Sequence, residues 1–203
     1  MSCDYNYDPC ARDPCTPRYI PQWDGCGWCP RPAPTPLPIP SRLAITYIAD
    51  IIGTVLVPAG GVPIPPGTII PLGQTTVPAG TVTVLTGYGA PSSSIGGFIV
   101  NNGFFTAPCA GFYSVSVNAA FAIPPAVAAT DVRELYLYRV SVSGLVMLLG
   151  VDSKVPSAAT LTYLNVSTSV ELFAGDRIFA AVRQDSAAAL GTAPTGRIAI
   201  VKI

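Results

Sequence analysis

The sequence predicts an all-β protein whose antiparallel strands pack as a sandwich. Only 11% of the 203 residues are charged, half are hydrophobic, and 19 glycines and 22 prolines are spread along the chain. Valine, threonine, isoleucine and tyrosine favour strands, whereas glycine and proline favour turns. From Arg42 onward, short runs that alternate between apolar and polar residues are separated by Pro-Gly or Ala-Gly pairs. This spacing is typical of a sandwich or barrel.

Residues 1–29 form the first of three regions, and we expect them to be an irregular arm. They show no hydrophobic periodicity and hold five of the six cysteines: Cys3, Cys10, Cys15, Cys26 and Cys29. Disulfides within or between subunits fit this density of cysteines best, while a zinc site and reduced thiols without a special role remain open. The CGWC segment has the spacing of zinc and redox motifs but the sequence context of neither. The odd number leaves one thiol to pair with another chain or with Cys109.

Residues 30–40 form the second region and read PRPAPTPLPIP. Proline at every second position removes backbone donors and fixes φ, so this segment cannot join the interior of a sheet. Extended at ~3.1 Å per residue, it would span roughly 34 Å as a semi-rigid spacer. We therefore expect it to hold the arm away from the rest of the chain.

Residues 41–203 form the third region, the predicted β domain. Its first strand-like run is Leu43–Val57, and a second is Thr81–Leu85. Two VPAG units, Val57–Gly60 and Val77–Gly80, are interpreted as similar hairpin turns. The glycine-rich stretch Gly87–Gly97 precedes no lysine and no expected helix, so we interpret it as a flexible connection and not as a phosphate-binding loop.

The later strands alternate clearly. In residues 113–121 one predicted face is apolar and the other polar. The apolar face carries Tyr113, Val115, Val117, Ala119 and Phe121, and the polar face carries Ser114, Ser116 and Asn118. The same alternation predicts half-buried strands around Val166–Leu172 and Arg197–Ile200. Leu135 and Leu137 oppose Tyr136 and Tyr138, so that strand has two apolar faces. We expect one face to line the sandwich interior and the other to meet a neighbouring subunit.

Three segments follow one another in a fixed order. The first is FTAPCAGFY, with Phe105, Thr106, Ala107, Pro108, Gly111 and Tyr113; the second is LFAGDRI, with Leu172, Gly175, Asp176 and Ile178; the third is the terminal GRIAIVKI. Over about residues 95–203 they resemble the complement-type globular head and the tumour necrosis factor-like jelly roll. They are also similar to tip domains of spore-surface collagen-like proteins, although Gly-X-Y repeats are absent here. The resemblance implies an antiparallel jelly-roll sandwich that works as a homotrimer.

The aromatic residues of these strands are our candidates for the trimer interface. They are Tyr113, Tyr136, Tyr138 and Phe179. A net charge of zero with few charged residues also favours association.

The chain offers little for catalysis. It contains no histidine, which removes the usual general base and imidazole metal ligand, and its acidic residues are scattered. We therefore expect no enzyme activity, no metal and no cofactor. Asp176 is interpreted as a turn residue that accepts backbone hydrogen bonds. Eleven acidic and eleven basic residues leave no cationic face, so neither nucleic acid nor a membrane is expected as a partner.

The N-terminus has neither the basic start nor the apolar core of a signal peptide, so we expect synthesis without one. A trimer-forming β domain, a cysteine-rich arm and disulfides formed after release would suit a particle assembled inside a cell. We predict a structural, self-assembling subunit of an outer layer or fibre on the surface of a bacterial spore or a virion, trimerising through the jelly roll and linked to its neighbours by the N-terminal arm. Its partners would be other copies of itself and another shell or coat protein. The alternative is a trimeric ligand-recognition module of the complement globular-head type.

Overall fold

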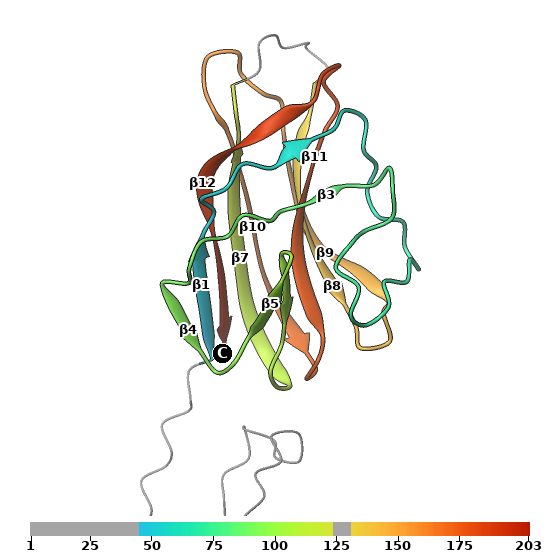
Figure 1. Cartoon of the computed structure of the whole chain (residues 1–203), viewed down its shortest axis with the longest axis vertical. Coiled ribbons are helices and arrows are strands. Elements are labelled where there is room, and N and C mark those ends of the chain that lie inside the picture. Colours follow the sequence, from blue (N-terminus) through green and yellow to red (C-terminus); the bar gives the residue numbers. More distant parts are fainter. Residues whose placement is uncertain (1–44, 124–130) are drawn as a thin grey trace, which may run out of the picture. The chain divides into compact units, whose positions relative to one another are not determined.

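Two antiparallel sheets lie face to face in the computed structural model, which describes residues 45–123 and 131–203 (Figure 1). The first sheet consists of β1 (Thr46–Asp50), β2 (Leu56–Val57), β4 (Ser93–Ile95), β7 (Gly111–Phe121), β10 (Thr162–Leu172) and β12 (Leu190–Lys202). The second consists of β3 (Thr83–Val84), β5 (Ile99–Asn101), β6 (Phe104–Thr106), β8 (Arg133–Val140), β9 (Val146–Lys154) and β11 (Arg177–Gln184). The described ranges contain no helix, so the all-β prediction is confirmed.

The strand order is β10-β7-β12-β1-β4 in the first sheet and β5-β6-β11-β8-β9 in the second. Strand β12 lies between β7 and β1 in this sheet. It therefore pairs with one strand from the middle of the described sequence and with one from its start. Short strand β2 pairs with β12, and β3 pairs with β11. These pairings join segments far apart in sequence, as a jelly roll requires.

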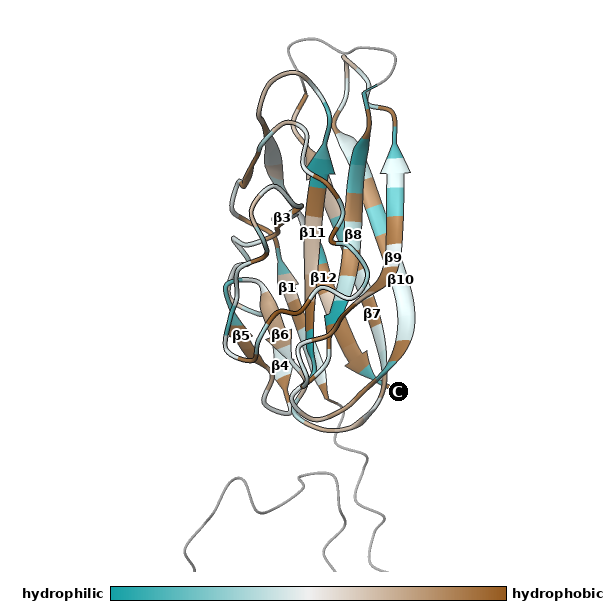
Figure 2. Ribbon diagram, turned by 90° about the vertical axis from the view of Figure 1, so that its right-hand side faces the viewer, coloured by the Kyte–Doolittle hydropathy of each residue, from teal (hydrophilic) through white to brown (hydrophobic). Residues whose placement is uncertain are grey.

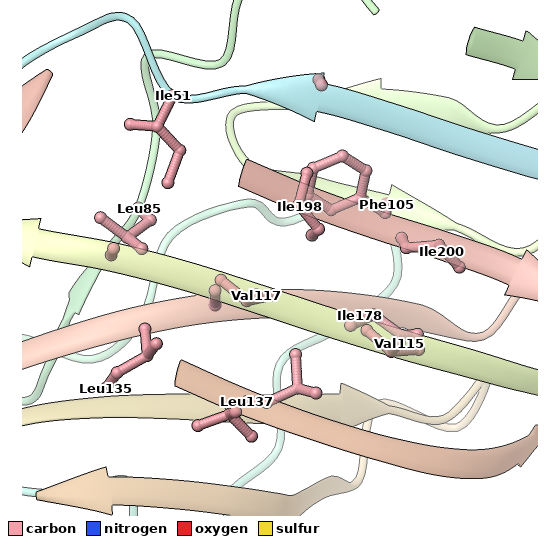
Figure 3. Close-up of a cluster of buried hydrophobic side chains, with 14 of the residues drawn as sticks. Ile51, Leu85, Phe105, Val115, Val117, Leu135, Leu137, Ile178, Ile198 and Ile200 are labelled. Carbon is pink, nitrogen blue, oxygen red and sulfur yellow. The ribbon is translucent and has the colours of Figure 1, made fainter. Parts of the chain in front are cut away.

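The apolar residues of the alternating strands form the main core between the two sheets. Val115 and Val117 on β7 are completely buried and face Leu135, Leu137 and Ile178 of the other sheet (Figure 3). Aromatic rings fill one end of this core, where several of them meet edge to face: Tyr47, Tyr88, Phe98, Phe105 and Tyr113. The interior is thus closed by the two inner faces, as alternating strands predict.

Two expectations about the first half of the β domain are wrong. The run Leu43–Val57 is not one strand, because β1 ends at Asp50 and β2 begins only at Leu56. Between them Gly53 approaches Gly87 so closely that a Cβ on Gly53 would lie 2.8 Å from the Gly87 Cα. The glycine-rich stretch is also more than a connection, since Ser93–Ile95 forms β4 and pairs with β1. Backbone contacts between distant glycines are invisible to a local pattern.

The long connection between β2 and β3 packs over the outer face of the second sheet. We call residues 58–82 the covering segment; Figure 2 shows it running beside β11 and β8. Its buried apolar residues Ile64, Ile70 and Val82 form a second core with residues of the sheet. That second core also contains Phe104, Tyr136, Tyr138, Val140, Val146, Phe179 and Ala181. Strands β8 and β11 of the second sheet are therefore buried on both faces, whereas β5 and much of β9 remain exposed.

The β sandwich belongs to one compact unit, Ala44–Ile203. The predicted arm and spacer, with all five of the cysteines assigned to cross-linking, lie outside the described residues. Within the described residues, none of the secondary structure is a helix of the length and hydrophobicity needed to span a membrane.

Candidate functional site

The four aromatic residues predicted at a subunit interface are all buried inside the single chain. Tyr136, Tyr138 and Phe179 lie beneath the covering segment, and Tyr138 stacks on Phe179 with ring centroids 5.1 Å apart. Tyr113 lies on the other sheet, in the main core. The second apolar face of β8 is thus covered by the chain itself and not by a neighbour. A second subunit could reach Tyr136, Tyr138 and Phe179 only if the covering segment moved away.

Arg177 holds the covering segment to the second sheet. Its guanidinium donates hydrogen bonds to the backbone carbonyl oxygens of Ile70, at 2.8 Å, Pro71, at 3.1 Å, and Gln74. It also lies over the Phe104 ring, 5.5 Å from the centroid. Burial lowers the pKa of Arg177 from its ordinary value. A buried guanidinium with several acceptors fixes a segment that has little strand structure of its own.

Further polar contacts fix the start of the same segment. The Tyr138 hydroxyl accepts a hydrogen bond from the Ile64 backbone N–H at 3.2 Å. Arg183 donates to the Gly61 carbonyl oxygen and forms an ion pair with Glu134, which also accepts a bond from the Tyr136 hydroxyl at 2.7 Å. Burial, together with this bond to Glu134, raises the pKa of Tyr136.

The two VPAG units do not form matching hairpin turns, contrary to the prediction. In the second unit the Thr81 N–H donates to the Pro78 carbonyl and closes a turn, whereas the Gly60 N–H of the first donates to Gln184 on β11. The first unit and Gly80 at the end of the second line one cavity of about 180 Å³ beside Arg183. Small-molecule sites usually occupy about 300–1,000 Å³, so this space is small for a ligand pocket.

The outer face of the first sheet has no such cover from the described chain. The strand register aligns two rows of residues across all five main strands, and each of these residues is at least partly exposed. One row is Ser93, Ile48, Ala199, Ser116 and Ser167; the other is Ile95, Thr46, Val201, Ser114 and Ser169. We call these ten residues the open face. Most are small, so another backbone could approach closely.

Larger side chains border the open face. Phe112 at one end of β7 is 56% exposed, and Tyr163 at the opposite end of β10 is 57% exposed. Next to the rows, Arg197 pairs with Asp50 at 2.7 Å on the solvent side. Exposed aromatic rings at both ends of a small-residue surface are the kind of anchors that interfaces use.

Asp176 performs the structural role expected from the sequence. Its carboxylate is fully buried and accepts hydrogen bonds from the backbone N–H groups of Phe173, at 2.9 Å, and Val142, at 3.0 Å. Arg139 completes the arrangement with an ion pair of 2.6 Å. The prediction of a turn-capping residue is confirmed.

No group of three or more cysteine, aspartate or glutamate residues within 45–123 and 131–203 is arranged to hold a metal ion. The covering segment was the main feature missed from the sequence. Two signals could have revealed it. One is the set of apolar residues in a proline-rich stretch, Ile64, Ile70 and Val82, and the other is the second apolar face of β8. Neither signal specifies that the covering segment packs on the outer face of β8.

Comparison with known proteins supports the architecture. No protein-family model matches the chain. An uncharacterized protein of Acanthamoeba polyphaga mimivirus is 36% identical over an alignment of 151 residues, which covers 72% of this chain and 57% of that protein. The chain thus spans a little over half of that relative's length.

Among solved structures, Eiger TNF from S. frugiperda aligns with a TM-score of 0.53 and 16% identity, over 80% of this chain and 94% of that one. Murine APRIL at pH 8.5 aligns with a TM-score of 0.50 and 12% identity, over 78% of this chain and 99% of that one. The link to the complement head and to spore tip domains stays a prediction. On the strand order and these two structures, the chain has the tumour necrosis factor-like jelly-roll fold.

Proposed function

We propose that this protein is a structural subunit of the outer layer of a virion, and that it trimerises through the open face of its jelly roll. The observation that carries the proposal is the contrast between the two sheets. The outer faces of the central strands β8 and β11 of the second sheet are closed by the covering segment, while the first sheet presents two registered rows of mostly small residues bordered by exposed aromatics. In a threefold ring each copy would place one part of this surface against a different part of its neighbour, a heterologous contact that closes after three copies.

The choice of a virion over a spore surface rests on the relative. The matching protein comes from a giant virus, and the resemblance extends over 151 residues of this chain. In this proposal residues 1–29 link one trimer to a neighbour or to an underlying shell, through their cysteines. Residues 30–40 act as the spacer between that linkage and the jelly roll.

The trimer is tested by measuring the native mass of the full chain and of Ser116→Arg. Ser116 lies between Ala199 and Ser167 in one row of the open face, so a long charged side chain there should prevent close approach of a second copy. We expect a three-chain mass for the wild type and a single-chain mass for the variant, with an unchanged β spectrum. Thr76→Arg is the matched control, because Thr76 is exposed on the covering segment.

Two results would contradict the proposed trimer: a monomeric wild type, or a Ser116→Arg variant that keeps the three-chain mass. The same measurement without residues 1–40 tests the linkage. The shortened chain should keep the three-chain mass and lose any larger assembly. Trimers of the full chain that never assemble further would favour the ligand-recognition module instead.

A further inference from the structure

Cys109 lies beside a lysine at one end of the sandwich. The Lys202 Nζ donates a hydrogen bond to the Cys109 Sγ at 3.1 Å, and the Tyr113 hydroxyl is 3.5 Å from the same sulfur. The Tyr113 hydroxyl also donates to the Cys109 carbonyl oxygen at 2.8 Å, which fixes the loop that carries the thiol. The Cys109 side chain is only 2% exposed, so a thiol of another chain would have difficulty reaching it.

The lysine reaches the sulfur because of its position on β12. Ile198 and Ile200 face the core, and the alternation of the strand points Lys202 to the same side, opposite Tyr113 in the register. Its side chain then crosses Gly111. A Cβ built on Gly111 would collide with the Lys202 Cε. The absence of a side chain at position 111 thus opens the path from the amine to the thiol.

We propose that Cys109 and Lys202 form an oxidative covalent cross-link when the protein meets a peroxide. In the first step the sulfur attacks one oxygen of hydrogen peroxide, the O–O bond breaks, and a sulfenic acid and one water result. In the second step the unprotonated Lys202 amine attacks the sulfur, the S–O bond breaks, and a second water leaves. One peroxide is reduced, the chain loses two hydrogens, and an S–N bond joins the two side chains.

This cross-link would close a covalent loop from residue 109 to residue 202. It would bind the end of β12 to the loop before β7, next to the point where the Lys202 N–H donates to the Ile45 carbonyl at 2.8 Å. β12 is the central strand of the first sheet, so its end would no longer fray independently. The inference does not depend on the proposed trimer.

The test is a peptide map of the full chain after treatment with hydrogen peroxide, denaturation and digestion with trypsin and chymotrypsin. We expect Thr106–Phe112 joined to Ile198–Ile203, with a mass about 2 Da below the sum of the two peptides. A joined pair about 14 Da above the sum would carry an N–O–S bridge made with a second peroxide, and it would equally support the cross-link. Cys109 found unmodified, or oxidised to a sulfinic acid without the joined pair, would overturn the proposal.

Lys202→Arg is the matched control, since it keeps the positive charge and the length of the side chain. After peroxide treatment the wild type should gain about 10 °C in Tm relative to its untreated form, because a long loop has been closed, and Lys202→Arg should not. Both chains carry the same N-terminal cysteines, so their oxidation cancels in the comparison. An equal gain in both chains would contradict the proposal, and the wild-type peptide map decides the matter even if the variant does not fold.

Discussion

The outer faces of the two sheets differ in whether residues of the same chain cover them. On the second sheet the aromatic side chains of β8 and β11 are covered by residues 58–82 of the same chain. On the first sheet the open-face residues of β7, β10 and β12 are serine, alanine and valine, and no described residue covers them. A large apolar face was closed within the chain, and a small-residue face was left open.

This difference shows that the aromatic face of β8 and β11 is not accessible to partners in the single chain. Aromatic composition identified the more hydrophobic face correctly, yet that face is already occupied. Accessibility, and not hydrophobicity, therefore decides where a second copy can bind. The following predictions test how firmly the covering segment is held and how little the open face contributes to the fold of a single chain.

The largest effect is expected when the guanidinium under the covering segment is removed. Arg177→Met leaves the carbonyl oxygens of Ile70, Pro71 and Gln74 without their donor. We expect the free energy of unfolding to fall by about 3 kcal/mol, measured by urea denaturation at constant protein concentration. Arg197→Met is the control, because Arg197 is paired on the exposed side, and its urea midpoint should stay at the wild-type value. Equal midpoints for both variants would show that Arg177 does not hold the segment.

A smaller effect is expected from the Tyr138 hydroxyl. In Tyr138→Phe the Ile64 N–H loses its acceptor, so the free energy of unfolding at neutral pH should fall by about 1 kcal/mol. Urea titration of the two proteins side by side measures this difference. A variant as stable as the wild type would mean that water replaces the hydroxyl.

The same pair of proteins has a predicted pH dependence. Burial raises the pKa of Tyr138 above its ordinary value of 10.0, so the folded chain holds the phenolic proton more tightly than the unfolded chain. This stabilisation is complete below the unfolded pKa and is lost as the pH rises toward the folded one. As the pH rises above about 10, the wild type should therefore lose stability more steeply than Tyr138→Phe, in which Tyr136 still titrates. Parallel pH profiles would contradict a buried, protonated Tyr138.

The smallest effect is expected on the open face. Ser167 is exposed and makes no contribution to either core, so Ser167→Ala should change the free energy of unfolding by less than about 0.5 kcal/mol. The measurement is urea denaturation at a concentration low enough to keep the chains apart. A loss well above this value would show that position 167 is closed in the single chain.

Much of the fold could be predicted from local patterns. The alternation around Tyr113 to Phe121 placed β7 correctly, because successive side chains of a strand point to opposite faces whatever surrounds them. The role of Asp176 was also predictable, since an aspartate after glycine in a turn has backbone donors within reach. Both features depend on residues close in sequence.

The covering segment could not be predicted in the same way. Ile64 contacts the Tyr138 region across more than seventy residues, and nothing in the proline-rich stretch specifies that partner. The Lys202 amine and the Cys109 thiol are likewise joined only by the pairing of β12 with β7. The sequence does show apolar residues in the covering segment and a lysine at a core-facing position of β12. It does not show which distant residues they contact.

By itself the order of residues determined the strand class, the inward and outward sides of β7, β10 and the end of β12, and the turn chemistry of Asp176, because these follow from the geometry of neighbouring residues. Only the tertiary structure decided that the tyrosines of β8 are covered from within, that the serines of β7 and β10 stay open, and that Cys109 meets Lys202. Such choices depend on which distant surfaces pack together, and the free energy of that packing belongs to the whole chain.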